Sequence, residues 1–163
     1  MRKQSLHRNF YNHCMTKTEK AVELFKSGYS CSQAVLCAFA PELGLDEQTA
    51  LKMAAPFGGG MGRMREVCGA FSGLLMAAGL KYAPANPQDP AAKAAHYALV
   101  QELGAKFKAQ NGSLICRELL GLPGAQKPQP DPRTGEYYKK RPCADMVACA
   151  AQLMEELLQK EAN

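Results

Sequence analysis

Helix start and stop signals recur along this chain, and no run of residues follows the two-residue alternation of a β-strand. Two capping boxes open helices, one pairing Thr16 with Glu19 and the other pairing Ser30 with Gln33. Asp46 caps a third helix. Because apolar residues then recur at helical spacing, the sequence predicts an all-α fold, a single-domain helical bundle of about six to seven helices.

The longest apolar stretch, Val67 to Leu80, predicts a central helix that begins at about Glu66. This helix is rich in glycine and alanine and apolar nearly all round, so we expect it to be buried and to allow a close approach by another helix. The stretch is shorter than the ~20 residues that span a bilayer, so no membrane partner is expected. With no secretory signal in residues 1–15, the chain is interpreted as cytoplasmic.

The 163 residues fit one domain. Residues 1–15 are interpreted as a polar N-terminal arm and residues 16–163 as a single helical domain. A long helix is predicted over about Pro90–Gln110, a short one from Ser113, and a last one that Pro142 opens. Between the last two, residues 122–141 are rich in proline and charge and are predicted to form an exposed loop.

Seven cysteines are spread widely along the chain: Cys14, Cys31, Cys37, Cys68, Cys116, Cys143 and Cys149. An odd number at wide spacing is not typical of a secreted disulfide framework. Four of the seven fall in predicted first turns of helices, namely Cys31, Cys68, Cys116 and Cys143. This shared placement makes these four the candidate site.

The first turn of a helix offers unpaired N–H groups and the positive end of the helix dipole, and both favour a thiolate over a thiol. We therefore expect the pKa of a cysteine there to be lowered. Four arginines next to these cysteines in sequence strengthen the expectation: Arg63, Arg65, Arg117 and Arg141. Thiolates attack disulfides and bind metals, so the placement suits a redox site and a metal site alike.

Core packing is the alternative for any single cysteine, because free cysteines are among the most buried residues. The chain has no Cys-x-x-Cys pair, so the spacing is not a zinc signature. Cys37 and Cys149 each lie six residues beyond a first-turn cysteine and are interpreted as core residues. Cys14, in the polar arm, is interpreted as incidental.

The loop before the central helix contains four glycines within five residues, Gly58 to Gly62. Neither a P-loop nor a dinucleotide-binding motif fits, since no strand precedes the loop and no Gly-Lys-Ser/Thr follows. In one interpretation its bare backbone faces a thiolate or a cluster, so that the cofactor-binding candidates are Gly59, Gly60, Gly62 and Gly69. In the other, the loop is a tight connector between packed helices.

Five segments in this order carry a resemblance to a known family: residues 28–36 (GYSCSQAVL), 57–62 (FGGGMG), 68–73 (CGAFSG) and 116–121 (CRELLG), and Cys143. From about Glu19 to Leu158 the chain resembles the C-GCAxxG-C-C family of redox-active proteins. The resemblance implies four functional cysteines, and by position these are Cys31, Cys68, Cys116 and Cys143. They are the four that the helix starts indicate.

Three functions remain open at this point. In the first, the four cysteines are redox-active, either as ligands of an iron–sulfur cluster, most simply [2Fe–2S], or as a thiol/disulfide couple. In the second, they hold zinc in a structural or regulatory module. In the third, the chain is a helical interaction protein and the cysteines pack its core. Whether the chain is an enzyme is left undecided.

The expected partner is a redox protein or a small-molecule thiol, and the small-residue central helix is compatible with a homo-oligomer. A net charge of +5 without a basic stripe gives no reason to expect nucleic acid binding.

Overall fold

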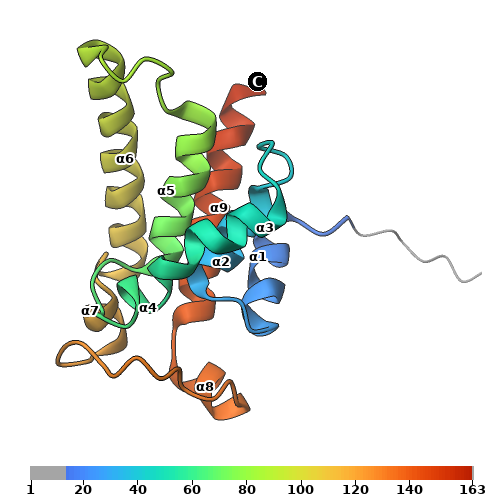
Figure 1. The fold of residues 1–163 in the computed structure, drawn as a ribbon, viewed down its shortest axis with the longest axis vertical. Helices are drawn as coiled ribbons and strands as arrows, with labels where there is room; N and C mark the ends of the chain where they lie inside the picture. The colour runs from blue at the N-terminus through green and yellow to red at the C-terminus, as the bar shows by residue number, and fades with distance from the viewer. Residues whose placement is uncertain (1–13, 163) are drawn as a thin grey trace, which may run out of the picture.

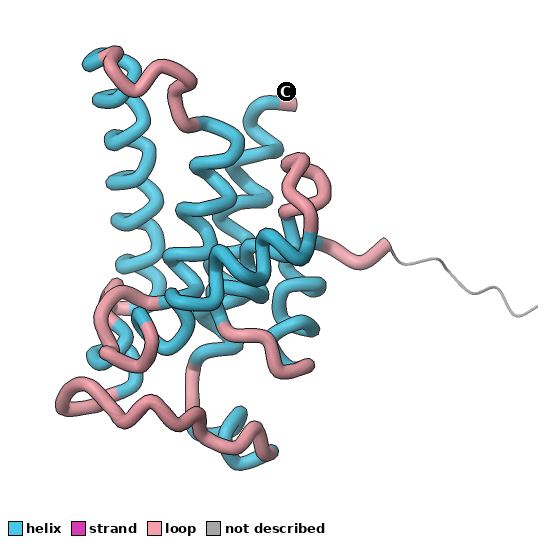
Figure 2. The backbone as a smooth tube through the Cα atoms, in the orientation of Figure 1, coloured by secondary structure: helices cyan, strands magenta, loops and turns pink. Residues whose placement is uncertain are grey.

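The computed structural model describes residues 14–162, so nearly all of the predicted arm lies outside the described residues. The described chain is helical, without a strand, and the all-α prediction is confirmed (Figures 1 and 2). The elements in chain order are α1 (Lys17–Lys26), α2 (Cys31–Phe39), α3 (Glu47–Ala54), the 3-10 turn η1 (Ala55–Phe57), α4 (Gly58–Met61), α5 (Gly69–Tyr82), α6 (Pro90–Asn111), α7 (Cys116–Leu120), α8 (Gly135–Lys140) and α9 (Cys143–Glu161).

The predicted caps open the first helices. The Glu19 N–H donates to Thr16 Oγ1 at 3.1 Å, and the Thr16 N–H donates to Glu19 Oε2 at 2.8 Å. Ser30 and Gln33 form the same reciprocal pair at the start of α2, with distances of 3.1 and 3.3 Å. These boxes satisfy backbone donors that the first turn leaves unpaired, so α2 begins at residue 31.

The core lies where α2, α5 and α9 pack together, with α1 against α2 and α9 (Figure 1). Helices α2 and α5 approach closely at Gly73, where an added Cβ would lie 2.7 Å from the Ser32 carbonyl oxygen. The predicted close approach at the central helix is therefore present. Across residues 14–162 no helix is long and apolar enough to cross a membrane.

The central helix begins at Gly69, three residues later than predicted, because the segment before it is extended. Val67 and Ile115 form an antiparallel bridge. Beside it the Cys68 N–H donates to the Leu114 carbonyl at 2.8 Å, and the Cys116 N–H donates to the Glu66 carbonyl at 2.6 Å. This short pairing ties the start of α5 to the start of α7, and local sequence signals do not contain it.

The long helix α6 is anchored by its second half, where Leu103 and Phe107 are buried. Helix α8 lies within residues 122–141, where the sequence indicates only a loop. Helices α4, α7 and α8 gather at one end of the molecule (Figure 1). That end carries the candidate site.

Candidate functional site

All four candidate cysteines lie at helix starts. Cys31, Cys116 and Cys143 are the first residues of α2, α7 and α9, and Cys68 directly precedes α5. The four come from four elements that are distant in sequence and meet at one end of the bundle.

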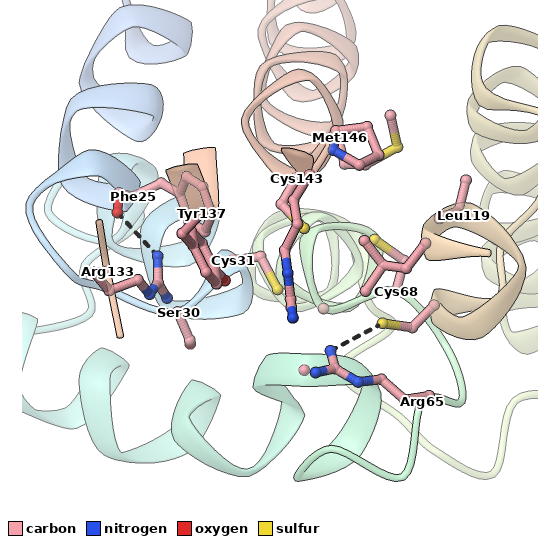
Figure 3. Close-up of a pocket in the computed structure, with 16 residues that line it drawn as sticks. Phe25, Ser30, Cys31, Arg65, Cys68, Leu119, Arg133, Tyr137, Cys143 and Met146 are labelled. Carbon is pink, nitrogen blue, oxygen red and sulfur yellow. Dashed lines mark hydrogen bonds between the residues drawn. The ribbon is translucent and has the colours of Figure 1, made fainter. Parts of the chain in front are cut away.

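The four cysteines line one cavity of about 60 Å³. Cys31, Cys68 and Cys143 point toward a common space (Figure 3), and all four are free thiols. Cys68 and Cys116 are 6% and 8% exposed. By volume the cavity has room for about two water molecules, so its contents are limited to a small ligand or the reacting end of a larger one.

A left-handed turn contributes Gly59 to the cavity lining. Residues 59–63 all have positive φ, and two of them, Met61 and Arg63, are not glycine. Left-handed backbone costs an L-residue roughly 1–2 kcal/mol, and such strain concentrates at functional sites. The turn directs the Gly59 N–H at the sulfur of Cys31.

Two glycines near the cavity, Gly60 of this turn and Gly69 of α5, pack directly against cysteines. An added Cβ at Gly69 would lie 2.4 Å from Cys31 Sγ, and one at Gly60 would lie 2.5 Å from the Cβ of Cys116. Gly59 and Gly69 line the cavity itself, whereas Gly62 lines an adjoining groove. Because Gly60 and Gly69 have no side chain, the side chains of Cys116 and Cys31 can lie this close to the backbone.

Burial raises the pKa of three thiols, contrary to the expected lowering. Burial raises the pKa of Cys31, and the Gly59 and Ser32 N–H groups offset only part of it. Burial is the main cause that raises the pKa of Cys68, and the negative charge of a Cys31 thiolate raises it further. Burial raises the pKa of Cys143 to about 12, with the guanidinium of Arg141 opposing it. Desolvation disfavours the thiolate more than the helix start favours it.

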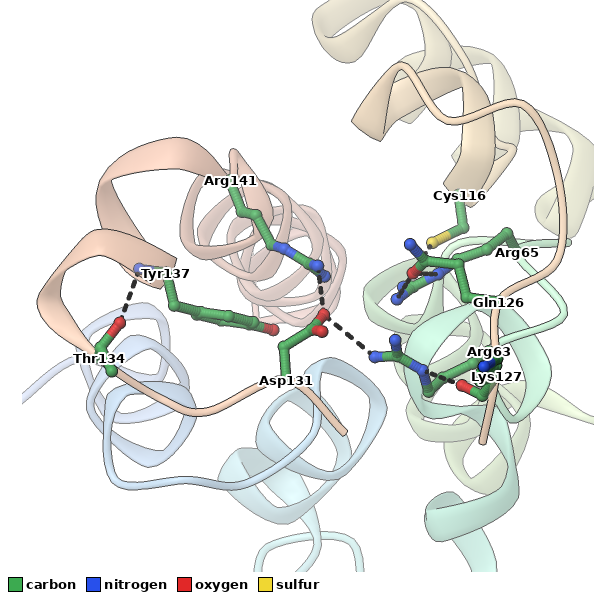
Figure 4. A network of polar contacts seen from close by, with 9 residues as sticks. All are labelled: Arg63, Arg65, Cys116, Gln126, Lys127, Asp131, Thr134, Tyr137 and Arg141. Carbon is green, nitrogen blue, oxygen red and sulfur yellow. Dashed lines mark hydrogen bonds and ion pairs between the residues drawn. The ribbon is translucent and has the colours of Figure 1, made fainter. Parts of the chain in front are cut away.

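Cys116 differs from the other three because a buried cation contacts its sulfur. Arg65 is 3% exposed, and its Nη1 donates to Cys116 Sγ at 3.6 Å (Figures 3 and 4). The other donors of this guanidinium go to a neutral acceptor, Gln126 Oε1, at 2.6 and 3.0 Å. Within residues 14–162 no carboxylate pairs with Arg65. Among the residues that the structure describes, the one contact of Arg65 that can carry negative charge is therefore the sulfur of Cys116.

Of the other three arginines, one lies at the cavity and two form ion pairs with carboxylates. Arg141 lines the cavity and faces Cys143. Arg63 pairs with Asp131 at 3.2 Å, and Arg117 pairs with Glu66 at 3.0 Å. Arg65 lies near Cys68 in sequence but contacts Cys116, because residues 65–68 pair with residues 114–117.

Residues 122–141 supply three cavity residues, of which sequence reasoning missed Arg133 and Tyr137. Arg133, Tyr137 and Arg141 all line the cavity. The guanidinium groups of Arg133 and Arg141 each lie 4.7 Å from the centre of the Tyr137 ring. Burial raises the pKa of Tyr137, although both arginines oppose the rise. The density of arginine and tyrosine in this segment is a signal that could have indicated a role beyond an exposed loop.

The remaining cysteines lie elsewhere. Cys37 and Cys149 are 3% and 8% exposed and belong to the hydrophobic core, as predicted, while Cys14 is exposed. Cys149 Sγ contacts the side-chain amides of Gln110 and Asn111, both at 3.2 Å. Neither buried thiol lines the cavity.

The donor set around the cavity has the chemistry of a metal or cluster site, because thiolate sulfur is the usual ligand of zinc and iron–sulfur clusters. The geometry does not provide one. Among residues 14–162 no three cysteine, histidine, aspartate or glutamate side chains come together in a way that could hold a metal ion. A zinc ion or a cluster would therefore require these side chains to rearrange.

Free cysteines that converge on a small cavity in an all-α fold define a class of helical thiol proteins. Residues 29–157 match the family described as "Putative redox-active protein (C_GCAxxG_C_C)", and the chain belongs to that family. The predicted family membership is thereby confirmed. No curated protein and no solved structure matches the chain.

Proposed function

We propose that this protein is a thiol–disulfide redox protein in which Cys116 is the attacking thiol and Cys31, Cys68 and Cys143 supply the second thiol. The contact of the buried Arg65 guanidinium with Cys116 Sγ carries this proposal. A guanidinium beside a sulfur atom stabilises negative charge that develops there, and the thiolate is the nucleophile in exchange reactions.

The reaction balances as a two-electron exchange. The Cys116 thiolate attacks one sulfur of a substrate disulfide, forms a mixed disulfide, and releases the other half as a thiolate. A second cysteine passes its proton to that thiolate and attacks the Cys116 sulfur, which releases the remaining half as a thiolate that takes a proton from water. The substrate is reduced to two thiols while the protein gains one disulfide, and an external thiol reductant restores it.

The raised pKa values support this division of roles. Cys31, Cys68 and Cys143 hold their protons near neutral pH, so each is a poor nucleophile until a base accepts its proton. The thiolate that leaves the substrate in the first step is such a base. The second thiol would therefore stay unreactive until Cys116 has formed a mixed disulfide and the substrate thiolate has been released.

The proposal is tested by treating the reduced protein, without oxygen at pH 7, with 2-hydroxyethyl disulfide and locating disulfides by mass spectrometry. We expect one disulfide per chain, between Cys116 and one of the other three cavity cysteines. Cys116→Ser should slow the reaction at least tenfold. Cys149→Ser is the matched control, because Cys149 is equally buried but lies outside the cavity, and it should react like the wild type.

Other outcomes would overturn the thiol mechanism and select an alternative. Iron and sulfide in stoichiometric amounts, after purification without oxygen, would select the cluster form. One equivalent of zinc would select a structural or regulatory metal module. Metal-free protein whose four thiols resist alkylation until it unfolds would select cysteines that only pack the core.

A further inference from the structure

An open groove of about 560 Å³ adjoins the cysteine cavity. The two share part of their lining: Ser30, Gly59, Arg65, Arg133, Tyr137 and Arg141. A molecule in the groove therefore lies against the same side chains that surround the sulfurs.

The lining of the groove is strongly basic. It contains four arginines and one carboxylate, Asp131, so its formal charge is +3. Figure 4 shows Asp131 between Arg63 and Arg141, and it pairs with both. The hydrogen bond from Arg63 is the main cause that lowers the pKa of Asp131, so this carboxylate stays charged at neutral pH. The Asp131 carboxylate thus pairs with two of the four arginines.

Apart from the contact of Arg65 with Cys116 Sγ, the other two arginines donate only to uncharged oxygen acceptors among the described residues. Arg65 donates to the amide oxygen of Gln126. Arg133 donates to the carbonyl oxygens of Phe25 and Tyr29, at 3.5 and 3.3 Å, and lies over aromatic rings. Guanidinium groups without a carboxylate partner in a concave wall attract an anion, and carboxylates can bind them through two parallel hydrogen bonds.

Resting on the thiol–disulfide function proposed above, we propose that the groove selects anionic substrates: small disulfides whose carboxylate groups bind its arginines while the S–S bond reaches Cys116. The covalent steps are those already given. The groove adds recognition, because it raises the local concentration of a carboxylate-bearing disulfide and repels a cationic one.

The test uses three small symmetrical disulfides that differ in charge: 3,3′-dithiodipropionate (two carboxylates), 2-hydroxyethyl disulfide (neutral) and cystamine (two ammonium groups). Each rate constant is divided by that of the same disulfide with N-acetylcysteine amide, a neutral thiol, to remove differences in intrinsic reactivity. We expect a preference of roughly tenfold for the dicarboxylate over the neutral compound, and the reverse for cystamine. At 0.5 M NaCl the preference should shrink.

Matched variants separate the groove from the positive charge of the whole protein. Arg133→Gln should reduce the preference at least threefold, because Arg133 has no carboxylate partner among the described residues. Lys93→Gln removes the same charge from an exposed position on α6 and should leave the preference unchanged. Equal effects of the two variants, or equal relative rates for the three disulfides, would overturn the groove proposal while leaving the thiol function standing.

A binding measurement does not depend on the chemistry. Suberate, in which two methylenes replace the S–S bond of dithiodipropionate, is titrated calorimetrically into the Cys116→Ser protein. We expect binding that Arg133→Gln weakens and Lys93→Gln does not, and an absence of binding would overturn the groove proposal. Failure of all three disulfides to react with the wild type would instead overturn the proposed function.

Discussion

At the scale of single residues, burial decides the chemistry of the cysteines more than their place in a helix does. A helix terminus stabilises a nearby charge by about 0.3–1 kcal/mol, whereas full burial can shift a pKa by 3–5 units. The balance at Cys31 follows this order, since burial outweighs the Gly59 and Ser32 N–H groups that face its sulfur. Position at a helix start thus selects the four cysteines that line one cavity, although it predicts the wrong direction for the pKa shift of three of them.

The glycine that follows Cys68 is predicted to be essential for packing. In Gly69→Ala the new Cβ would lie 2.4 Å from Cys31 Sγ and 2.7 Å from the backbone oxygen of Phe57. Because backbone cannot move aside cheaply, we expect the free energy of unfolding in urea to fall by about 1–3 kcal/mol.

Gly79→Ala, in the same helix, is the control for this prediction. No atom lies within 4 Å of the Cβ added there, so the free energy of unfolding should rise by up to about 1 kcal/mol through higher helix propensity. Equal effects of the two substitutions would contradict the close contact at Gly69.

At the scale of elements, the sequence predicts what local chemistry determines. The Ser30–Gln33 box places the start of α2 correctly, because capping involves residues three apart in the chain. The start of α5 is predicted three residues early, because residues 66–68 instead bond to residues 114–116, almost fifty positions away. No local pattern shows that pairing, although it positions Cys68 and Cys116.

The left-handed turn yields a prediction about strain. Met61 has a φ of 63° and an exposed side chain, so glycine relieves the steric cost while losing little packing. Met61→Gly should raise the free energy of unfolding by about 0.5–1 kcal/mol, after allowing for the greater freedom of glycine in the unfolded chain.

Met53→Gly is the matched control for the turn. Met53 is also exposed but lies in the right-handed helix α3, where glycine should cost about 1 kcal/mol. Chemical denaturation measures both variants. A loss of stability in both would show that residues 59–63 are not held in the left-handed conformation.

At the scale of the whole molecule, the site depends on convergence that the sequence does not display. The four cysteines can be chosen from their helix starts, yet their common cavity requires α2, α5, α7 and α9 to meet at one end. Residues 122–141 add Arg133, Tyr137 and Arg141, although their composition predicts an exposed loop. Composition reports the polarity of this segment, whereas its packing beside the cysteines depends on contacts between distant parts of the fold.

The buried thiols predict how the stability of the whole protein depends on pH. Cys143 has a pKa of about 12 when folded, against 9.0 for an ordinary thiol, so between these values the folded protein keeps a proton that the unfolded chain loses. The contribution is present in full below pH 9 and is lost as the pH rises toward 12, by at most about 1.4 kcal/mol per pH unit.

Serine does not titrate in this range, so Cys143→Ser isolates the contribution of this thiol. Urea unfolding with a reductant present, at several pH values from 7 to 11, gives the free energy of unfolding of both proteins. The difference, wild type minus variant, should be constant up to about pH 9 and then decrease, because only the wild type loses the contribution of Cys143. A difference independent of pH would mean that the Cys143 thiol is not desolvated in the folded protein, and the reason given for its low reactivity before the mixed disulfide forms would then be wrong.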